Sequence, residues 1–143
     1  MEEKTYRTAE DYFQEALVDL KFDETTIQEY MISLGRKRMK WGRYIYNEER
    51  NTKMGEQALA SIYKKWFHYY MYGDKTSKED IKIDKKFIDI YIKAQDDYKS
   101  CELKLAEQKN KEKFLNDVAK NLEQQTFVVN NFIKHLLYQA GGN

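Results

Sequence analysis

Apolar residues recur at intervals of three and four along most of the chain, which is the spacing of one face of an α-helix. The first such segment covers residues 8–20 and is otherwise rich in acids. Thr8 precedes it and is a residue type that caps helix N-termini. The pattern predicts a short acidic helix over 8–20 with an apolar face formed by Tyr12, Phe13, Ala16, Leu17 and Leu20.

A second, longer stripe predicts a helix over residues 25–72, with Asp23 or Thr25 as its cap. Gly35, Gly42 and Gly55 each weaken this helix by up to about 1 kcal/mol relative to alanine, which leaves open a kink or break near residues 51–55. The stripe consists of Ile27, Met31, Leu34, Trp41, Ile45, Leu59, Ile62, Trp66 and Tyr69.

The segment 73–95 has a different pattern. Residues 73–80 have the composition of a loop, and the apolar positions of 81–83 and 87–92 alternate with a period nearer two than 3.6. We expect a loop followed by a short extended segment that packs on the helices.

The last periodic segment predicts a helix over 96–139, capped by Asp96 or Asp97 and ended by the glycines at 141–142. Its seam includes the polar residues Gln108 and Glu112, which either loosen the packing there or fix the register. From residue 127 onward the chain is far more apolar than elsewhere. This end is therefore the expected contact between subunits, through Phe127, Val129, Phe132, Ile133, Leu136 and Leu137.

These elements predict an all-α fold, with long antiparallel helices in an elongated bundle that assembles through helix–helix contacts. A length of 143 residues indicates one domain. The absence of proline and a charged fraction of 34% fit long helices with a small core. The single Cys101 indicates a reducing compartment, and the chain has neither a signal peptide nor an apolar run long enough for a membrane span, so we expect a soluble intracellular protein.

The net charge of +1 hides a strongly polarised chain. Residues 1–35 carry −6, residues 36–72 carry +6 and the remainder is nearly neutral. Five cations lie within residues 36–43 without an acid among them, and aromatic rings are interleaved with the cations up to residue 72. Such a segment suits a polyanion that also offers faces for stacking, which describes single-stranded nucleic acid. The candidates from this segment are Arg36, Lys37, Lys40 and Arg43 for phosphates, and Phe67 and Tyr70 for bases.

No catalytic or metal-binding pattern accompanies these residues. A phosphate loop would need a glycine upstream of Gly35 and a Ser or Thr after Lys37, and the sequence has neither. His68 and His135 have no Cys or carboxylate at ligand spacing. We therefore expect no enzyme activity, no cofactor and no metal.

The order of these features resembles the UvsY-like recombination mediators of tailed phages, over nearly the whole chain. The residues that carry the resemblance are Asp19-Leu20-Lys21-Phe22-Asp23, the Lys-Trp-x-x-Tyr-Tyr motif of Lys65 to Tyr70, Asp96-Asp97-Tyr98, Phe114-Leu115, and the run from Gln125 to Ile133. The last of these, with its aromatic, aliphatic and Asn residues followed by a glycine ending, is the most telling.

The resemblance implies a protein without catalytic activity that binds single-stranded DNA coated by the phage single-strand-binding protein. There it would help the phage recombinase form its filament, in recombination, repair and recombination-dependent replication, in the cytoplasm of the infected bacterial host. It also implies a ring-like homo-oligomer of about six or seven subunits. In the family a basic pair upstream of Tyr-Tyr contributes to DNA contact, and the matching positions here are Lys64 and Lys65.

Two other readings of the basic segment stay open. The cations could balance acids on neighbouring helices of a structural or adaptor coiled coil that does not bind DNA. A regulator that reads duplex DNA with a basic helix is the third reading, although no helix-turn-helix spacing supports it.

Overall fold

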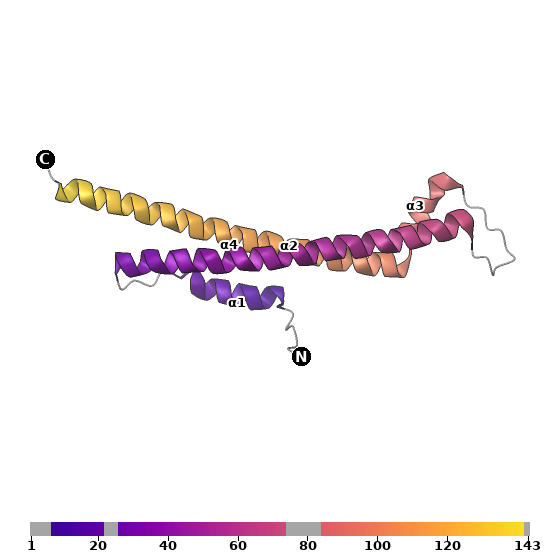
Figure 1. The fold of residues 1–143 in the computed structure, drawn as a ribbon, viewed down its shortest axis with the longest axis horizontal. Coiled ribbons are helices and arrows are strands. Elements are labelled where there is room, and N and C mark those ends of the chain that lie inside the picture. The colour runs from indigo at the N-terminus through magenta and orange to yellow at the C-terminus, as the bar shows by residue number, and fades with distance from the viewer. Residues whose placement is uncertain (1–6, 22–25, 74–83, 142–143) are drawn as a thin grey trace. The chain divides into compact units, whose positions relative to one another are not determined.

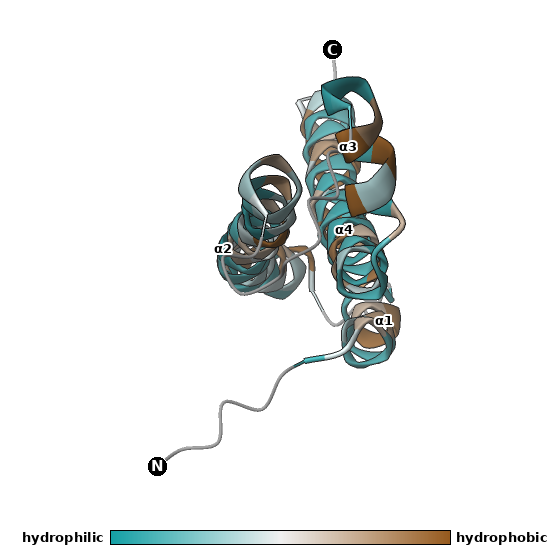
Figure 2. Ribbon diagram, turned by 90° about the vertical axis from the view of Figure 1, so that its right-hand side faces the viewer, coloured by the Kyte–Doolittle hydropathy of each residue, from teal (hydrophilic) through white to brown (hydrophobic). Residues whose placement is uncertain are grey.

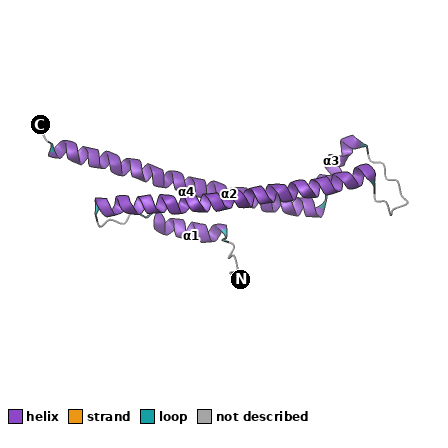
Figure 3. Cartoon of the chain, in the orientation of Figure 1, coloured by secondary structure: helices purple, strands orange, loops and turns teal. Residues whose placement is uncertain are grey.

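The computed structural model describes residues 7–21, 26–73 and 84–141, and every regular element in these ranges is a helix (Figures 1 and 3). The helices are α1 (Ala9–Asp19), α2 (Ile27–Tyr72), α3 (Lys85–Lys93) and α4 (Asp96–Ala140). The predicted all-α class is therefore confirmed. The loop expected over 73–80 lies almost entirely outside the described residues.

The helices pack into two compact units. Unit 1 comprises residues 1–47 and 111–143, and unit 2 comprises residues 48–110. Helices α2 and α4 each contribute residues to both units. Unit 1 is therefore built from two separate segments of the chain, whereas unit 2 is one contiguous segment. The single domain expected from the length stays a prediction.

In unit 1, α1 begins at the cap that the sequence predicted. The Thr8 side chain accepts a hydrogen bond from the Asp11 backbone N–H (3.2 Å), and the Asp11 carboxylate accepts one from the Thr8 N–H (2.9 Å). This reciprocal capping box satisfies two backbone donors that the helix itself leaves unpaired. It fixes the start of α1 at Ala9, three positions before the buried Tyr12.

The core of unit 1 lies where α1, the first part of α2 and the last part of α4 meet. Trp41, Leu34, Leu115 and Leu122 are completely buried in it. Burial of side chains of this size contributes about 1.5–3 kcal/mol each relative to exposure. Tyr30 of α2 donates to Gln125 of α4 through its hydroxyl at 3.0 Å.

In unit 2, α2 and α4 run antiparallel around a polar layer. Gln108 Nε2 donates to Glu48 Oε2 at 2.6 Å and to the Glu48 carbonyl at 3.2 Å, and both side chains are buried. The sequence left open whether Gln108 loosens the packing or fixes the register of the two helices. This pairing supports the second role, because a shift of α4 along α2 would leave the buried Glu48 carboxylate without its Gln108 donor.

Helix α2 passes through residues 51–55 without a break. A Cβ built on Gly55 would lie 3.1 Å from Leu105 Cδ1 of α4, so the glycine at this position permits close packing of the two helices. The helix ends at Gly73, which has φ of +71° and whose N–H donates to the Tyr69 carbonyl at 2.8 Å. This is a left-handed glycine cap.

The extended segment expected within 81–92 is wrong over the residues described, because residues 85–93 form the helix α3. Ile88 and Ile92 are buried one turn apart, whereas Ile90 is 63% exposed although the alternating pattern would bury it. Figure 2 shows hydrophobic and hydrophilic residues on different sides of α3. Its buried face packs with Tyr98 against a partly buried group on α2: Leu59, Ile62, Tyr63, Trp66, Tyr70 and Met71.

Two helix caps also differ from expectation. For α2, Asp23 and Thr25 lie outside the described residues, and the cap is Thr26, whose Oγ1 accepts from the Glu29 N–H at 3.1 Å. For α4, Asp96 and Asp97 lie inside the first turn. The Asp97 carboxylate accepts hydrogen bonds mainly from α2 side chains, as described below.

Candidate nucleic-acid interface

The predicted DNA-binding residues all lie on α2 but belong to different units. Unit 1 holds Arg36, Lys37, Lys40 and Arg43, and unit 2 holds Lys64, Lys65, Phe67 and Tyr70. Each set is a separate candidate surface.

The unit 1 surface, here called the basic stripe, follows from helix geometry. Arg36 and Arg43 are seven residues apart, so they share the face of α2 opposite Leu34 and Trp41, which are buried, and Lys40 lies at the edge of that face toward α1. Arg36 and Arg43 are exposed and lie roughly 10 Å apart along the helix axis. The basic stripe thus consists of these two arginines, Lys40 and the half-buried Lys37.

Two surface hollows accompany the basic stripe. Arg36 and Lys37 line one with Glu29, Ile32 and Ser33. Lys40 and Arg43 line the other with Met39, Tyr44 and Asn47. Each hollow combines cations with apolar or aromatic side chains, which are the groups that contact a phosphate backbone and unstacked bases.

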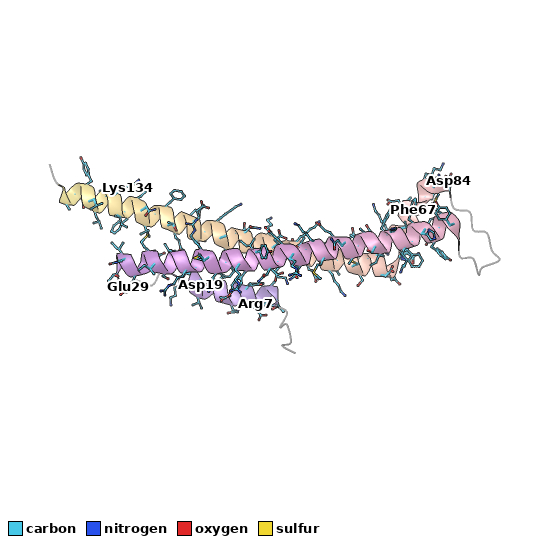
Figure 4. All side chains as sticks on the ribbon, viewed as in Figure 1. Arg7, Asp19, Glu29, Phe67, Asp84 and Lys134 are labelled. Atoms are coloured by element: carbon cyan, nitrogen blue, oxygen red, sulfur yellow. The ribbon has the colours of Figure 1, made fainter. Side chains whose placement is uncertain are left out.

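Lys40 differs from the rest of the basic stripe because α1 supplies its counter-ions. Its Nζ donates to Glu15 Oε1 at 3.2 Å and forms a closer ion pair with Asp19. Asp19 also accepts from Trp41 Nε1 at 2.9 Å. Figure 4 labels Asp19 on α1. Burial opposes ionisation of Asp19, but the hydrogen bonds from Lys40 and Trp41 and the Lys40 charge lower its pKa overall.

The remaining cations of this segment have no such partner. Within the described parts of the chain, Arg36, Lys37, Arg38 and Arg43 form no ion pair. Arg38 is exposed as well, and the sequence analysis did not include it among the site residues although it lies in the same cation run.

In unit 2 the two lysines of the Lys64–Lys65 pair have different surroundings. Lys64 is exposed and forms no ion pair with the residues described. Lys65 Nζ donates to Asp97 Oδ2 of α4 at 2.8 Å, and its side chain remains 60% exposed. The hydrogen bond from Lys65 is the main reason that the pKa of Asp97 is lowered.

The two aromatic candidates also differ. Phe67 is 41% exposed and stacks on Tyr63 with ring centroids 6.4 Å apart. Figure 4 labels it on α2. Tyr70 is half-buried among Trp66 and Tyr91, and its hydroxyl accepts from Gln95 Nε2. Tyr70 is therefore part of the packing between α2 and α3, and Phe67 is the better placed of the two to stack on a base.

Exposed rings that the sequence analysis assigned to the core or left out lie on the same unit. Tyr69, expected in the core, is 44% exposed, and Tyr72 and Tyr91 are 72% and 49% exposed. Helix α3 packs against Trp66 and Tyr70 of α2, whereas Tyr69 and Tyr72 of the same helix stay exposed. Because residues 85–93 were expected to be extended, the sequence pattern did not indicate which rings of α2 they would cover.

The predicted self-association residues divide between core and surface. Val129 belongs to the buried core of unit 1, and Ile133 packs against that core. Phe127, Phe132, Leu136 and Leu137 are exposed, as are their neighbours Val128 and Tyr138. An apolar surface of this extent at the end of α4 is the kind that protein–protein contacts cover.

Other classes of site were also sought in the parts of the chain that the structure describes. Residues 7–21, 26–73 and 84–141 contain no cluster of three or more His, Cys, Asp or Glu side chains arranged to hold a metal ion. No helix in these ranges combines the length and apolar character needed to cross a membrane.

Comparison with known proteins identifies the fold and the family of this chain. The chain is similar to the crystal structure of the bacteriophage T4 recombination mediator protein UvsY (lattice type II), with a TM-score of 0.80 and 16% sequence identity over 94% of this chain and 99% of that one. At this identity the likeness shows the fold. No curated protein sequence matches the chain. A family model described as "Recombination, repair and ssDNA binding protein UvsY" matches residues 15–142, and the chain therefore belongs to the UvsY family.

Proposed function

We propose that this protein binds single-stranded DNA through the exposed cations of α2, and that it helps load a phage recombinase onto DNA covered by single-strand-binding protein. It would act without catalytic activity of its own, in the cytoplasm of the infected host, during recombination, repair and recombination-dependent replication. The observation that carries the proposal is the exposed, unpaired state of Arg36, Arg38 and Arg43 within the described chain.

The chemistry of the ligand follows from that observation. Guanidinium and ammonium groups that protein carboxylates do not neutralise attract phosphates, and each phosphate contact releases counter-ions from the nucleic acid. The hollows along the basic stripe and the exposed ring of Phe67 add apolar contacts that an unpaired base can use. The family description, which names single-stranded DNA, supports the same ligand.

Self-association is the second part of the proposal. One subunit offers few phosphate contacts, so its affinity for a strand is low. The exposed end of α4 would join subunits into a ring-like homo-oligomer of about six or seven copies, in which repeated patches bind one strand together. Avidity of this kind raises affinity without any sequence readout, as a mediator that acts along any strand requires.

One observation favours an adaptor without DNA binding. Lys40 and Lys65 are both paired with acids of other helices, as a coiled coil that only balances its charges would require. The two readings differ over the unpaired cations. An adaptor has no use for Arg36, Lys37 and Arg43, whereas the DNA-binding reading depends on them.

Fluorescence anisotropy with a labelled thymidine oligonucleotide tests the proposal. A variant with Arg36→Ala, Lys37→Ala and Arg43→Ala should bind more weakly, with a salt dependence flatter by about two units of log Kd per log salt if all three cations contact phosphates. The matched control replaces Lys99, Lys104 and Lys120, exposed cations of α4, with alanine and removes the same charge. Equal binding by the two triple variants would contradict the proposed interface, and preference for a duplex competitor would favour a duplex-reading protein.

A further inference from the structure

The Asp97 carboxylate in unit 2 is held by donors from the α2 segment that carries Lys64. Lys65 Nζ donates to Oδ2 at 2.8 Å. Trp66 Nε1 lies 2.9 Å from Oδ1 and 3.1 Å from Oδ2. An ammonium group and an indole N–H, from adjacent residues of one helix, thus converge on one anion.

These two donors form the kind of site that a phosphate group occupies. Phosphate and carboxylate oxygens accept charge-assisted hydrogen bonds from the same donors at the same distances. The Lys65 ammonium also lies 4.8 Å from the centre of the Trp66 ring, so the indole borders the cation as well as the anion. The Asp97 carboxylate therefore occupies a position in which a phosphate group of a ligand could accept the same hydrogen bonds.

We propose that Lys65 and Trp66 form a subsite for a backbone phosphate of single-stranded DNA, and that Asp97 occupies this subsite in the free subunit. The proposal deepens the proposed function and rests on it. On binding, a phosphate replaces the carboxylate on both donors. Asp97 thereby lowers the affinity for single-stranded DNA and favours ligands able to displace it.

The accessibility of the pair makes this exchange feasible. The Lys65 and Asp97 side chains are 60% and 38% exposed, so water and a strand can reach both, and an ion pair this exposed contributes little to stability. The ion pair of Lys40 with Asp19 is different, because Asp19 is 13% exposed and also accepts from the fully buried Trp41. That pair belongs to the packing of α1, and no exchange is inferred there.

Asp97→Asn tests the proposal against a neighbouring control. Asparagine keeps an oxygen for the Trp66 N–H but removes the charge that holds Lys65. The control is Asp96→Asn, which removes the same charge from an exposed residue that forms no ion pair with the described residues. In about 0.15 M salt, where the Debye length is about 8 Å, charges that make no contact are largely screened.

Under these conditions Asp97→Asn should tighten binding of a thymidine oligonucleotide about two- to fivefold per engaged subunit, and Asp96→Asn should change it much less. Combination with Lys65→Ala isolates the mechanism. In the Lys65→Ala background, Asp97→Asn should have no larger effect than Asp96→Asn. Equal effects of the two asparagine variants with Lys65 present would overturn the proposal, as would an Asp97→Asn effect that persists without Lys65.

Circular dichroism shows whether each variant folds, and Asp97→Ser is a second neutral substitution that suits a first helical turn. A second measurement uses the unaltered protein and so does not depend on how either Asp97 variant folds. With 15N-labelled tryptophan, the indole N–H signal of Trp66, assigned by its loss in Trp66→Phe, should shift when oligonucleotide is added. A signal that stays unmoved while the oligonucleotide binds would also overturn the proposal.

Failure of this inference is distinguishable from failure of the proposed function. If the unaltered protein binds the oligonucleotide and the Arg36, Lys37 and Arg43 triple variant does not, while Asp97→Asn equals Asp96→Asn, the interface stands and only the masked subsite is rejected. If the unaltered protein binds no single-stranded DNA at all, the proposed function itself is rejected.

Discussion

The indole N–H of Trp41 donates to Asp19 Oδ2 at 2.9 Å and thereby joins the last residue of α1 to the most deeply buried side chain of α2. The same carboxylate binds Lys40, so a single acid serves both the core and the basic stripe. Tyr44 adds a second polar link, because its hydroxyl donates to Glu15 Oε1 at 3.1 Å. Helix α1 is thus attached to unit 1 by directed hydrogen bonds as well as by its apolar face.

Replacement of Asp19 should loosen this attachment. Asp19→Ala leaves the Trp41 N–H, inside the core, without its acceptor and also removes the closest counter-ion of Lys40. An unsatisfied buried donor costs about 1–3 kcal/mol, so we expect a loss of that size in the free energy of unfolding measured with urea. Glu10→Ala, at an exposed acid of the same helix, should change it by less than about 0.5 kcal/mol. Equal losses in the two variants would mean that the buried hydrogen bond does not anchor α1.

The same contacts predict how stability depends on pH. Burial opposes their ionisation, yet hydrogen bonds from Lys40 and other donors lower the pKa of Glu15 and of Asp19 below the reference values of 4.5 and 3.8. A carboxyl with a lowered pKa in the folded state contributes stability above its unfolded pKa, and that contribution is lost as pH falls through the folded value. The urea midpoint should therefore drop as pH falls below about 4.5, and the part due to Asp19 should be missing in Asp19→Asn. A midpoint with the same pH profile in both proteins would contradict this assignment.

How far the sequence predicts this structure depends on the kind of interaction. The long helices followed from the spacing of residues such as Leu34, Trp41 and Leu115, because a period of three and four survives any tertiary arrangement. The helix α3 did not follow from the sequence, because a short segment with β-branched residues at every second position fits a strand and a helix almost equally well. What decides between them is the side of α2 available to Ile88 and Ile92, which no local pattern contains.

The candidate interface shows the same division. The cation run was evident in the sequence, and Arg36 and Arg43 are exposed as a surface site requires. That Lys40 is paired with Asp19, and Lys65 with Asp97, depends on contacts between residues 21 and 32 positions apart, which composition and spacing do not reveal. Val129 is a different case at the apolar end of α4. The three-and-four spacing places it on the same seam as Leu122, but it was also expected in the subunit contact, and it is buried in the core of unit 1.

The helical state of residues 85–93 can be tested with three isoleucines of similar sequence context. In the helix α3, Ile88 and Ile92 are buried and Ile90 is exposed, whereas a strand would place all three on one face. Ile88→Ala or Ile92→Ala should each cost about 2–5 kcal/mol of unfolding free energy, the usual range for a buried isoleucine. Ile90→Ala should change it by less than about 0.5 kcal/mol in the same urea titration. Comparable losses at all three positions would indicate the extended arrangement instead.

Self-association through the end of α4 gives the prediction that connects the fold most directly to avidity. Phe132 and Leu137 are 51% and 65% exposed, and if they are covered by another subunit, a charge placed on them must be desolvated on assembly. The double variant Phe132→Asp with Leu137→Asp should therefore have a lower mass by light scattering and weaker binding to a long oligonucleotide. Its affinity for a strand too short to span two subunits should be unchanged.

The control adds the same two charges at exposed polar positions of the same helix, with Asn131→Asp and Gln139→Asp, and should assemble normally. If the control loses mass to the same extent, added charge alone disrupts the assembly. If the Phe132 and Leu137 variant keeps its full mass, the subunits join through another surface, and the apolar end of α4 serves a different contact.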